Sequence, residues 1–128
     1  MLSKKRKQDA ATLLGGASLG VGLALLVAPG LGGRMLGMKP DATPQAGSRL
    51  AVRALGIRDV AFGIGLFLTR KDRQAGAIWR RLFGLCMGVD AGAALLALRK
   101  PGANFFTFAG GFSSIGLAIL AFISAQED

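Results

Sequence analysis

The stretch GIRDVAFGIG, residues 56–65, places two charged side chains, Arg58 and Asp59, in the middle of an apolar run. That run extends from residue 50 to residue 69 and has about the 20 residues that a helix needs to cross the hydrocarbon core of a bilayer. Charges at that depth are costly, so charged residues in such a helix turn inward and pair. The stretch therefore predicts a membrane helix that needs partners on neighbouring helices.

Three other apolar stretches of similar length accompany this one. The four predicted spans cover residues 11–28, 50–69, 79–98 and 105–124. The 128-residue chain is 52% hydrophobic and contains 20 Gly but no His, which is unlike an ordinary soluble domain. We therefore expect a single all-α domain, residues 1–128, folded as a four-helix transmembrane bundle. Short connections after the second and third spans should make successive helices antiparallel neighbours.

The first apolar stretch follows the basic segment KKRK, residues 4–7, and so shares features with a secretory signal peptide. Its apolar run is as long as a full span and ends at Pro29-Gly30 rather than at a clear small-x-small cleavage site. We expect a retained first helix that also acts as a signal anchor, with cleavage as the alternative. Residues 29–48 are rich in Pro and Gly and should form one long outer loop or a short interfacial segment.

Basic residues beside the spans indicate the orientation of the bundle. With the amino terminus inside, nine of them face the cytoplasm, namely Lys4, Lys5, Arg6, Lys7, Arg70, Lys71, Arg73, Arg80 and Arg81. Five then face outward, namely Arg34, Lys39, Arg49, Arg99 and Lys100. This excess predicts a multi-pass protein of the plasma membrane with both termini in the cytoplasm.

The formal net charge of +9 favours contact with anionic lipids of the bilayer. In a soluble protein the same charge would suggest nucleic acid as a partner. Here the basic residues gather at the ends of apolar runs, and no aromatic residues interleave with them as a stacking platform would require. We therefore expect no nucleic-acid binding.

Glycine recurs at helical spacing in three of the predicted spans. The positions are Gly84, Gly88 and Gly92 in the third span, Gly16 and Gly20 in the first, and Gly56 and Gly63 in the second. Such stripes let another helix backbone approach closely in lipid. They are predicted to pack helices within the bundle, with a homodimer or a second membrane protein as the alternative partner.

Asp59 and Asp90 are predicted to meet at the middle of the membrane. Asp59 lies about 15 Å below the outer start of the second span, and Asp90 lies about as far above the inner start of the third. Arg58 is the one cation at that depth, and Arg53 lies about 9 Å nearer the outer face than Asp59. We expect an Arg58–Asp90 pair, with Asp59 facing a cavity or engaging Arg53. Unless Arg53 joins the group, one carboxyl group should hold a proton.

The candidate ligand or proton site, formed by Arg53, Arg58, Asp59 and Asp90, is compatible with three classes of function. The first is binding or transport of a small lipophilic or cationic ligand, and the second is a structural or accessory subunit of a larger membrane assembly. The third is an acid–base enzyme acting on a lipid-soluble substrate. A satisfied Arg–Asp network that only fixes helix packing remains the structural alternative.

Metal and cofactor chemistry has little support in the composition. The chain has no His, and its one cysteine, Cys86 in the third span, has no metal-ligand partner nearby in the sequence. We expect no metal and no cofactor, and an enzymatic role is the less favoured interpretation.

The run RALGIRDVAFGIGLF, residues 53–67, is followed by a basic loop and by GVDAG, residues 88–92. This pattern resembles an uncharacterised family of small four-span integral membrane proteins, known only as a domain of unknown function. The resemblance covers spans two to four and extends to the whole chain. The matching positions are Arg53, Gly56, Arg58, Asp59 and Asp90. It implies a four-helix membrane fold and no established activity.

Overall fold

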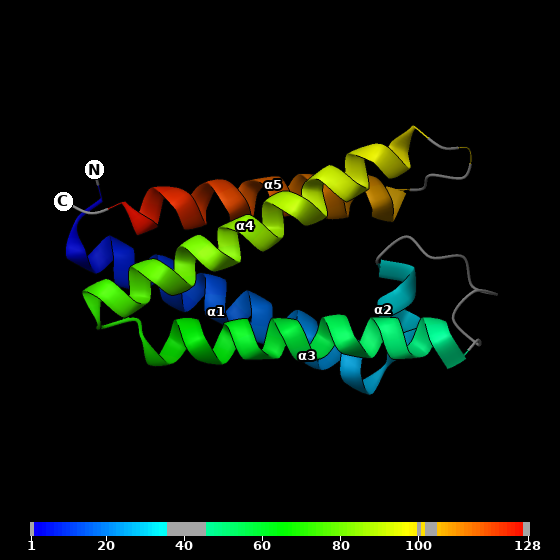
Figure 1. The fold of residues 1–128 in the computed structure, drawn as a ribbon, viewed down its shortest axis with the longest axis horizontal. Coiled ribbons are helices and arrows are strands. Elements are labelled where there is room, and N and C mark those ends of the chain that lie inside the picture. The colour runs from blue at the N-terminus through cyan, green and yellow to red at the C-terminus, as the bar shows by residue number, and fades with distance from the viewer. Residues whose placement is uncertain (1, 36–45, 100, 102–104, 127–128) are drawn as a thin grey trace.

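The computed structural model describes residues 2–35, 46–99, 101 and 105–126. Its long helices are α1 (Lys4–Val27), α3 (Ala46–Leu68), α4 (Arg73–Leu98) and α5 (Phe105–Ala125), and a short helix, α2 (Pro29–Met35), follows the first. The described ranges contain no strand, which confirms the predicted all-α class. Successive long helices run in opposite directions, so both chain ends lie at the same end of the molecule (Figure 1).

Three of the long helices, α1, α3 and α4, begin one to two turns before the predicted spans, and polar residues cap α1 and α4. Ser3 Oγ accepts a hydrogen bond from the backbone N–H of Arg6 at 3.4 Å and caps α1. Asp72 Oδ1 accepts one from the backbone N–H of Ala75 at 2.9 Å and caps α4. Each cap satisfies a backbone donor that a helix start leaves open.

Helices occupy both ends of the predicted loop over residues 29–48. Residues Pro29–Met35 form α2, whose first position suits proline because the ring presets the helical φ and the missing N–H would be unpaired there. The next long helix already begins at Ala46. The middle of the predicted loop, residues 36–45, lies outside the described residues.

Three helical segments are long and apolar enough to cross a membrane: Lys4–Val27, Arg73–Leu98 and Thr107–Ala125. α3 is not among them, because every 18-residue window within it contains Arg53, Arg58 and Asp59. Large apolar side chains also face outward, with Val27 82% exposed and Val89 71% exposed. These features support a helical membrane protein.

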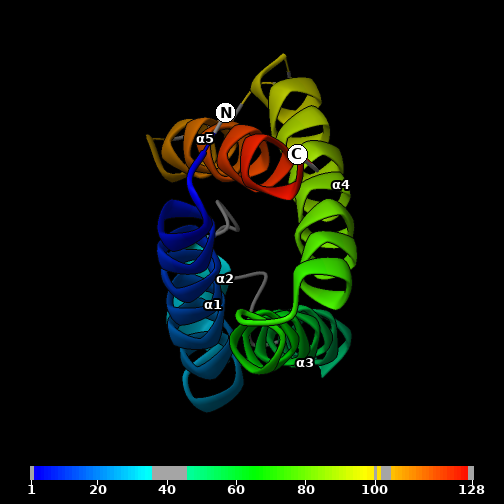
Figure 2. The same cartoon turned by 90° about the vertical axis from the view of Figure 1, so that its left-hand side faces the viewer.

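The four long helices are arranged as two close pairs. α1 packs along α3 and α4 packs along α5, whereas contact between the pairs is less extensive. Seen along the bundle, each helix has one neighbour from its own pair and one from the other pair (Figure 2). The pairs meet at the end that holds both termini and diverge toward the other end, where α2 contacts both α3 and α5 (Figure 1).

The apolar core lies where the two pairs meet. All four helices contribute to it, through Leu14 of α1, Leu66 of α3, Phe83 of α4 and Ala121 of α5, each at most 1% exposed. Beyond this shared core, toward the diverging end, α3 faces α4. This boundary between the two helices, where Arg58 contacts Asp90, is the seam. The candidate site lies on that seam.

Candidate functional site

Arg58 of α3 joins two carboxylates that come from two helices. Its Nη1 and Nη2 donate to Oδ1 and Oδ2 of Asp90 on α4 at 3.2 and 2.8 Å. Its Nε donates to Oδ1 of Asp59 at 3.0 Å, and Nη2 lies 3.0 Å from the same oxygen. A bidentate arginine–carboxylate pair fixes geometry as well as charge. Arg58, Asp59 and Asp90 are called the charge cluster below.

The charge cluster lies far from both ends of α3 and bridges the two helix pairs. Arg58 is about 18 Å from the start of α3 and about 15 Å from its end, at 1.5 Å rise per residue. Asp90 reaches it from α4, which belongs to the other pair. The guanidinium is therefore a polar link across the seam.

The charge cluster is half-buried and electrically unbalanced. Side-chain exposure is 10% for Asp59, 29% for Arg58 and 33% for Asp90. With both acids ionised, one guanidinium faces two carboxylates and the cluster carries a net charge of about −1. An uncompensated negative charge would therefore lie at a partly open position on the seam.

The helix positions around the cluster are apolar. Residues three or four positions away share a helix face. They are Ala54, Leu55, Ala61 and Phe62 around Arg58, and Cys86, Met87, Ala93 and Ala94 around Asp90. A ligand at the cluster would therefore meet one charged group in an otherwise apolar setting.

Asp59 is held in place from its other side by α1. Ser18 Oγ, which is buried, donates to the backbone oxygen of Asp59 at 2.7 Å. A hydroxyl buried in this way is satisfied by its acceptor, and the bond positions α1 against the residue that carries the carboxylate.

Glycines on both sides of that hydrogen bond allow α1 and α3 to meet backbone to backbone. A Cβ added at Gly22 would lie 2.7 Å from the backbone oxygen of Gly56. A Cβ added at Gly63 would lie 2.9 Å from the backbone oxygen of Gly15. Side chains larger than hydrogen therefore do not fit at these crossings without moving a helix.

The predicted packing glycines divide into two groups. Gly56 and Gly63 contact α1, and a Cβ added at Gly84 would lie 3.1 Å from the ring of Phe122 on α5. At the other four predicted positions an added Cβ meets nothing within 4 Å, so the structure lacks the expected close contacts at Gly16, Gly20, Gly88 and Gly92. On α1, Gly15 and Gly22 contact α3 instead, and they lie on a different face of the helix from Gly16 and Gly20.

Arg53 does not take part in the charge cluster. Its side chain is exposed and makes no hydrogen bond or ion pair within the described residues. Asp59, which was expected to face a cavity or engage Arg53, instead accepts from its sequence neighbour Arg58. The structure thus brings together three of the four predicted site residues.

Sequence reasoning missed the α1 residues that support the site. Gly15, Ser18 and Gly22 have the same spacing as Gly56, Asp59 and Gly63, and the two sets face each other. That matched spacing of small residues was the available signal. Its meaning depends on which helices pair, which the spacing alone does not specify.

Comparisons with known proteins found no matching family model, no matching curated protein and no matching solved structure. The resemblance to an uncharacterised four-span family stays a prediction. In the described ranges, no group of three or more His, Cys, Asp or Glu side chains is placed to hold a metal ion.

Proposed function

We propose that the chain is a four-span membrane protein that binds a small lipophilic cation at the charge cluster. The fourth span in this proposal is α3, which has 23 residues and so extends about 34 Å. Arg58 and Asp59 are paired within the cluster, which reduces the cost of placing them in the membrane. Arg53 lies nearer the start of α3, where a long side chain can carry its charge toward the interface.

The proposed orientation places both termini in the cytoplasm, in the plasma membrane. Its support is the distribution of basic residues, since KKRK at positions 4–7 and the segment RKDR at positions 70–73 belong to the same end of the molecule. Basic residues are enriched on the cytoplasmic side of membrane proteins.

The observation that carries the ligand proposal is that two carboxylates share one guanidinium at a partly open seam. The net negative charge attracts a cation, and the low dielectric of the surroundings strengthens that attraction. Asp90 is the most exposed member, so it is the proposed contact for the ligand's charge. The apolar helix positions around it favour an organic, lipophilic cation.

Exchange of such a cation for a proton follows from the same charge balance. A bound cation and a proton on one of the two carboxyl groups each bring the cluster to neutrality, so one can replace the other. Because the cluster bridges two helix pairs, either exchange also acts on the contact between the pairs. Binding with release against a proton is therefore the form of transport that we propose.

The test is binding of tetraphenylphosphonium to the purified full chain in detergent, measured by isothermal titration calorimetry. Asp90→Asn should weaken binding at least about tenfold, because it removes the charged contact. Asp9→Asn is the matched control, since Asp9 is an exposed acid on α1 outside the cluster, and it should bind like the unmodified chain. Absence of binding, or equal binding by Asp90→Asn, would contradict the proposal.

A structural or accessory role is the second candidate. It is favoured by the outward-facing glycines Gly16, Gly20, Gly88 and Gly92, which leave room for a helix from outside the chain. This candidate predicts a stoichiometric membrane-protein partner in native mass spectrometry of gently solubilised protein, together with no tetraphenylphosphonium binding.

A further inference from the structure

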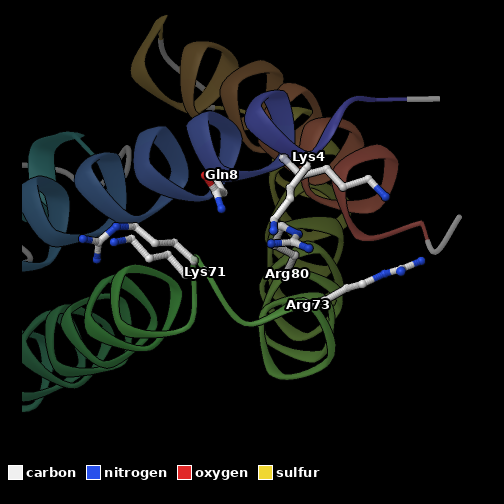
Figure 3. Close-up of a pocket in the computed structure, with 7 residues that line it drawn as sticks. Lys4, Gln8, Lys71, Arg73 and Arg80 are labelled. Carbon is white, nitrogen blue, oxygen red and sulfur yellow. The ribbon is translucent and has the colours of Figure 1, made fainter.

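A basic cavity of about 210 Å³ lies at the end of the bundle that holds both termini (Figure 3). Seven residues line it, six of them basic: Lys4, Lys7 and Gln8 on α1, Arg70 and Lys71 after α3, and Arg73 and Arg80 on α4. None of these lining residues is acidic. The cavity brings together side chains from three separate parts of the chain.

Arg80 is buried within this basic cavity. It is only 4% exposed, and its Nε has no hydrogen-bond partner in the described part of the chain. The guanidinium lies among the other lining residues, with Lys71 on one side and Arg73 extending away on the other (Figure 3). A buried donor without an acceptor is destabilising, so an acceptor supplied by a ligand would relieve that cost.

Gly76, one turn before Arg80, makes room for this side chain. A Cβ added at Gly76 would lie 3.1 Å from Arg80 Nη1 and 2.7 Å from the backbone oxygen of Thr69. The guanidinium is thus accommodated by the absence of a side chain at residue 76.

The helix directions add positive potential at the same place. α1 begins at Lys4 and α4 begins at Arg73, and both of these residues line the cavity. Backbone N–H groups at a helix start carry partial positive charge and attract anions. Arg80 lies about 10 Å along α4 from its first residue, a depth within reach of lipid phosphates if α4 crosses a membrane.

We propose that the basic cavity binds a phosphate group, with Arg80 as its buried anchor. A phosphate monoester carries a charge of about −1.5 to −2 and three acceptor oxygens, which suits a cavity lined by several cations. The planar fork of arginine can donate two parallel hydrogen bonds to phosphate oxygens. The phosphate belongs either to a lipid headgroup or to a free phosphate or diphosphate.

This site is separate from the charge cluster. Arg80 lies about 15 Å along α4 from Asp90, and the two sites have opposite charge. Its ligand is an anion, so the phosphate proposal does not rest on the proposed cation binding.

The experiment uses two probes on the full chain. Inorganic diphosphate is titrated calorimetrically into protein in a non-ionic detergent at fixed ionic strength. In a second arm, protein in nanodiscs of phosphatidylcholine with or without phosphatidic acid is examined by native mass spectrometry for retained lipid. Diphosphate binding identifies a free phosphate as the ligand, whereas selective retention of phosphatidic acid alone identifies a lipid headgroup.

Three variants decide whether the basic cavity is responsible. Arg80→Gln should weaken binding of the active probe at least about tenfold, because a charged hydrogen-bonding group is lost. Lys4→Gln combined with Lys71→Gln, at two exposed lining positions, gives a second test if Arg80→Gln fails to fold. Arg34→Gln removes the same charge from α2 at the opposite end and should leave binding within about twofold.

Two results would overturn the proposal. One is that neither probe binds the unmodified chain. The other is that Arg34→Gln weakens binding as much as the cavity variants do, because the net charge of the chain would then account for the attraction.

Discussion

Arg58 is the only guanidinium shared by the two acids of the charge cluster, and its loss would leave both without a counter-ion in the described structure. Removing one partner of an ion pair is most damaging where the remaining charge is left desolvated and unpaired, as it would be at Asp59, whose side chain is 10% exposed. Loss of Asp90 is different, since Arg58 still has Asp59 as its acceptor. The three residues are therefore unequal in what they contribute to stability.

We predict that Arg58→Gln lowers the free energy of unfolding by about 3 kcal/mol. Arg53→Gln is the matched control on the same helix, because Arg53 is exposed and unpaired within the described residues, and it should change that free energy by less than about 0.5 kcal/mol. Reversible unfolding in sodium dodecyl sulphate, followed by circular dichroism, measures both values. Equal effects of the two substitutions would show that the cluster contributes nothing specific.

For the charge cluster, the sequence predicted which residues lie close together. It did not predict all of the hydrogen bonds between them. Equal depth of Asp59 and Asp90 on adjacent antiparallel helices was enough to expect them near Arg58. The Arg58–Asp59 hydrogen bond was missed, because the 100° between neighbouring helical residues describes Cβ directions and ignores the reach of a long side chain. The Ser18 contact was missed because its acceptor is a backbone oxygen on another helix.

The pairing of α1 with α3 is the element that positions the cluster, and it depends on backbone contact at glycines. α1 carries Gly15, Gly16, Gly20 and Gly22, which lie on more than one face of the helix. Periodicity marks each face as suitable for packing. Which face meets α3 is decided only when the bundle assembles. The predicted packing residues were therefore Gly16 and Gly20, whereas Gly15 and Gly22 contact α3 in the structure.

We predict that Gly22→Ala destabilises the chain by about 2 kcal/mol, because its Cβ would overlap the backbone and side chain of α3. Gly20→Ala, two residues earlier on the same helix, adds a methyl group into open space and should be neutral or slightly stabilising. Thermal unfolding in detergent compares the two variants. A Gly20→Ala variant as unstable as Gly22→Ala would argue against the α1–α3 contact described here.

The whole molecule consists of two helix pairs linked by a shared core at one end and by the charge cluster along the seam. The helical class and the carboxyl ends of the long helices were predictable, because apolar length is a local feature of the sequence, whereas the capped starts of α1 and α4 were missed. The number of membrane crossings was harder to predict, because α3 contains too many charged residues to be recognised as a membrane span from composition alone. The basic cavity was not predictable, because three distant segments build it only when the chain folds.

We predict that Ser3 and Gln126 lie on the same side of the membrane, as four crossings require. If α3 did not cross, three crossings would place these residues on opposite sides. Single cysteines introduced by Ser3→Cys, Gly47→Cys or Gln126→Cys in a Cys86→Ser background can be labelled with a membrane-impermeant maleimide. Labelling of Ser3→Cys and Gln126→Cys only in opened cells, and of Gly47→Cys in intact cells, would agree with the proposed topology.

The most direct test of the central claim is to locate a bound lipophilic cation in the folded protein. A photoreactive tetraphenylphosphonium derivative would be cross-linked to the full chain in nanodiscs, and the labelled peptides mapped by mass spectrometry. We predict labelling concentrated in α3 and α4 beside Arg58 and Asp90, competed by unmodified tetraphenylphosphonium and lost in Asp90→Asn. Labelling spread evenly over the outer faces of the helices, and unchanged in Asp90→Asn, would contradict a cation site at the charge cluster.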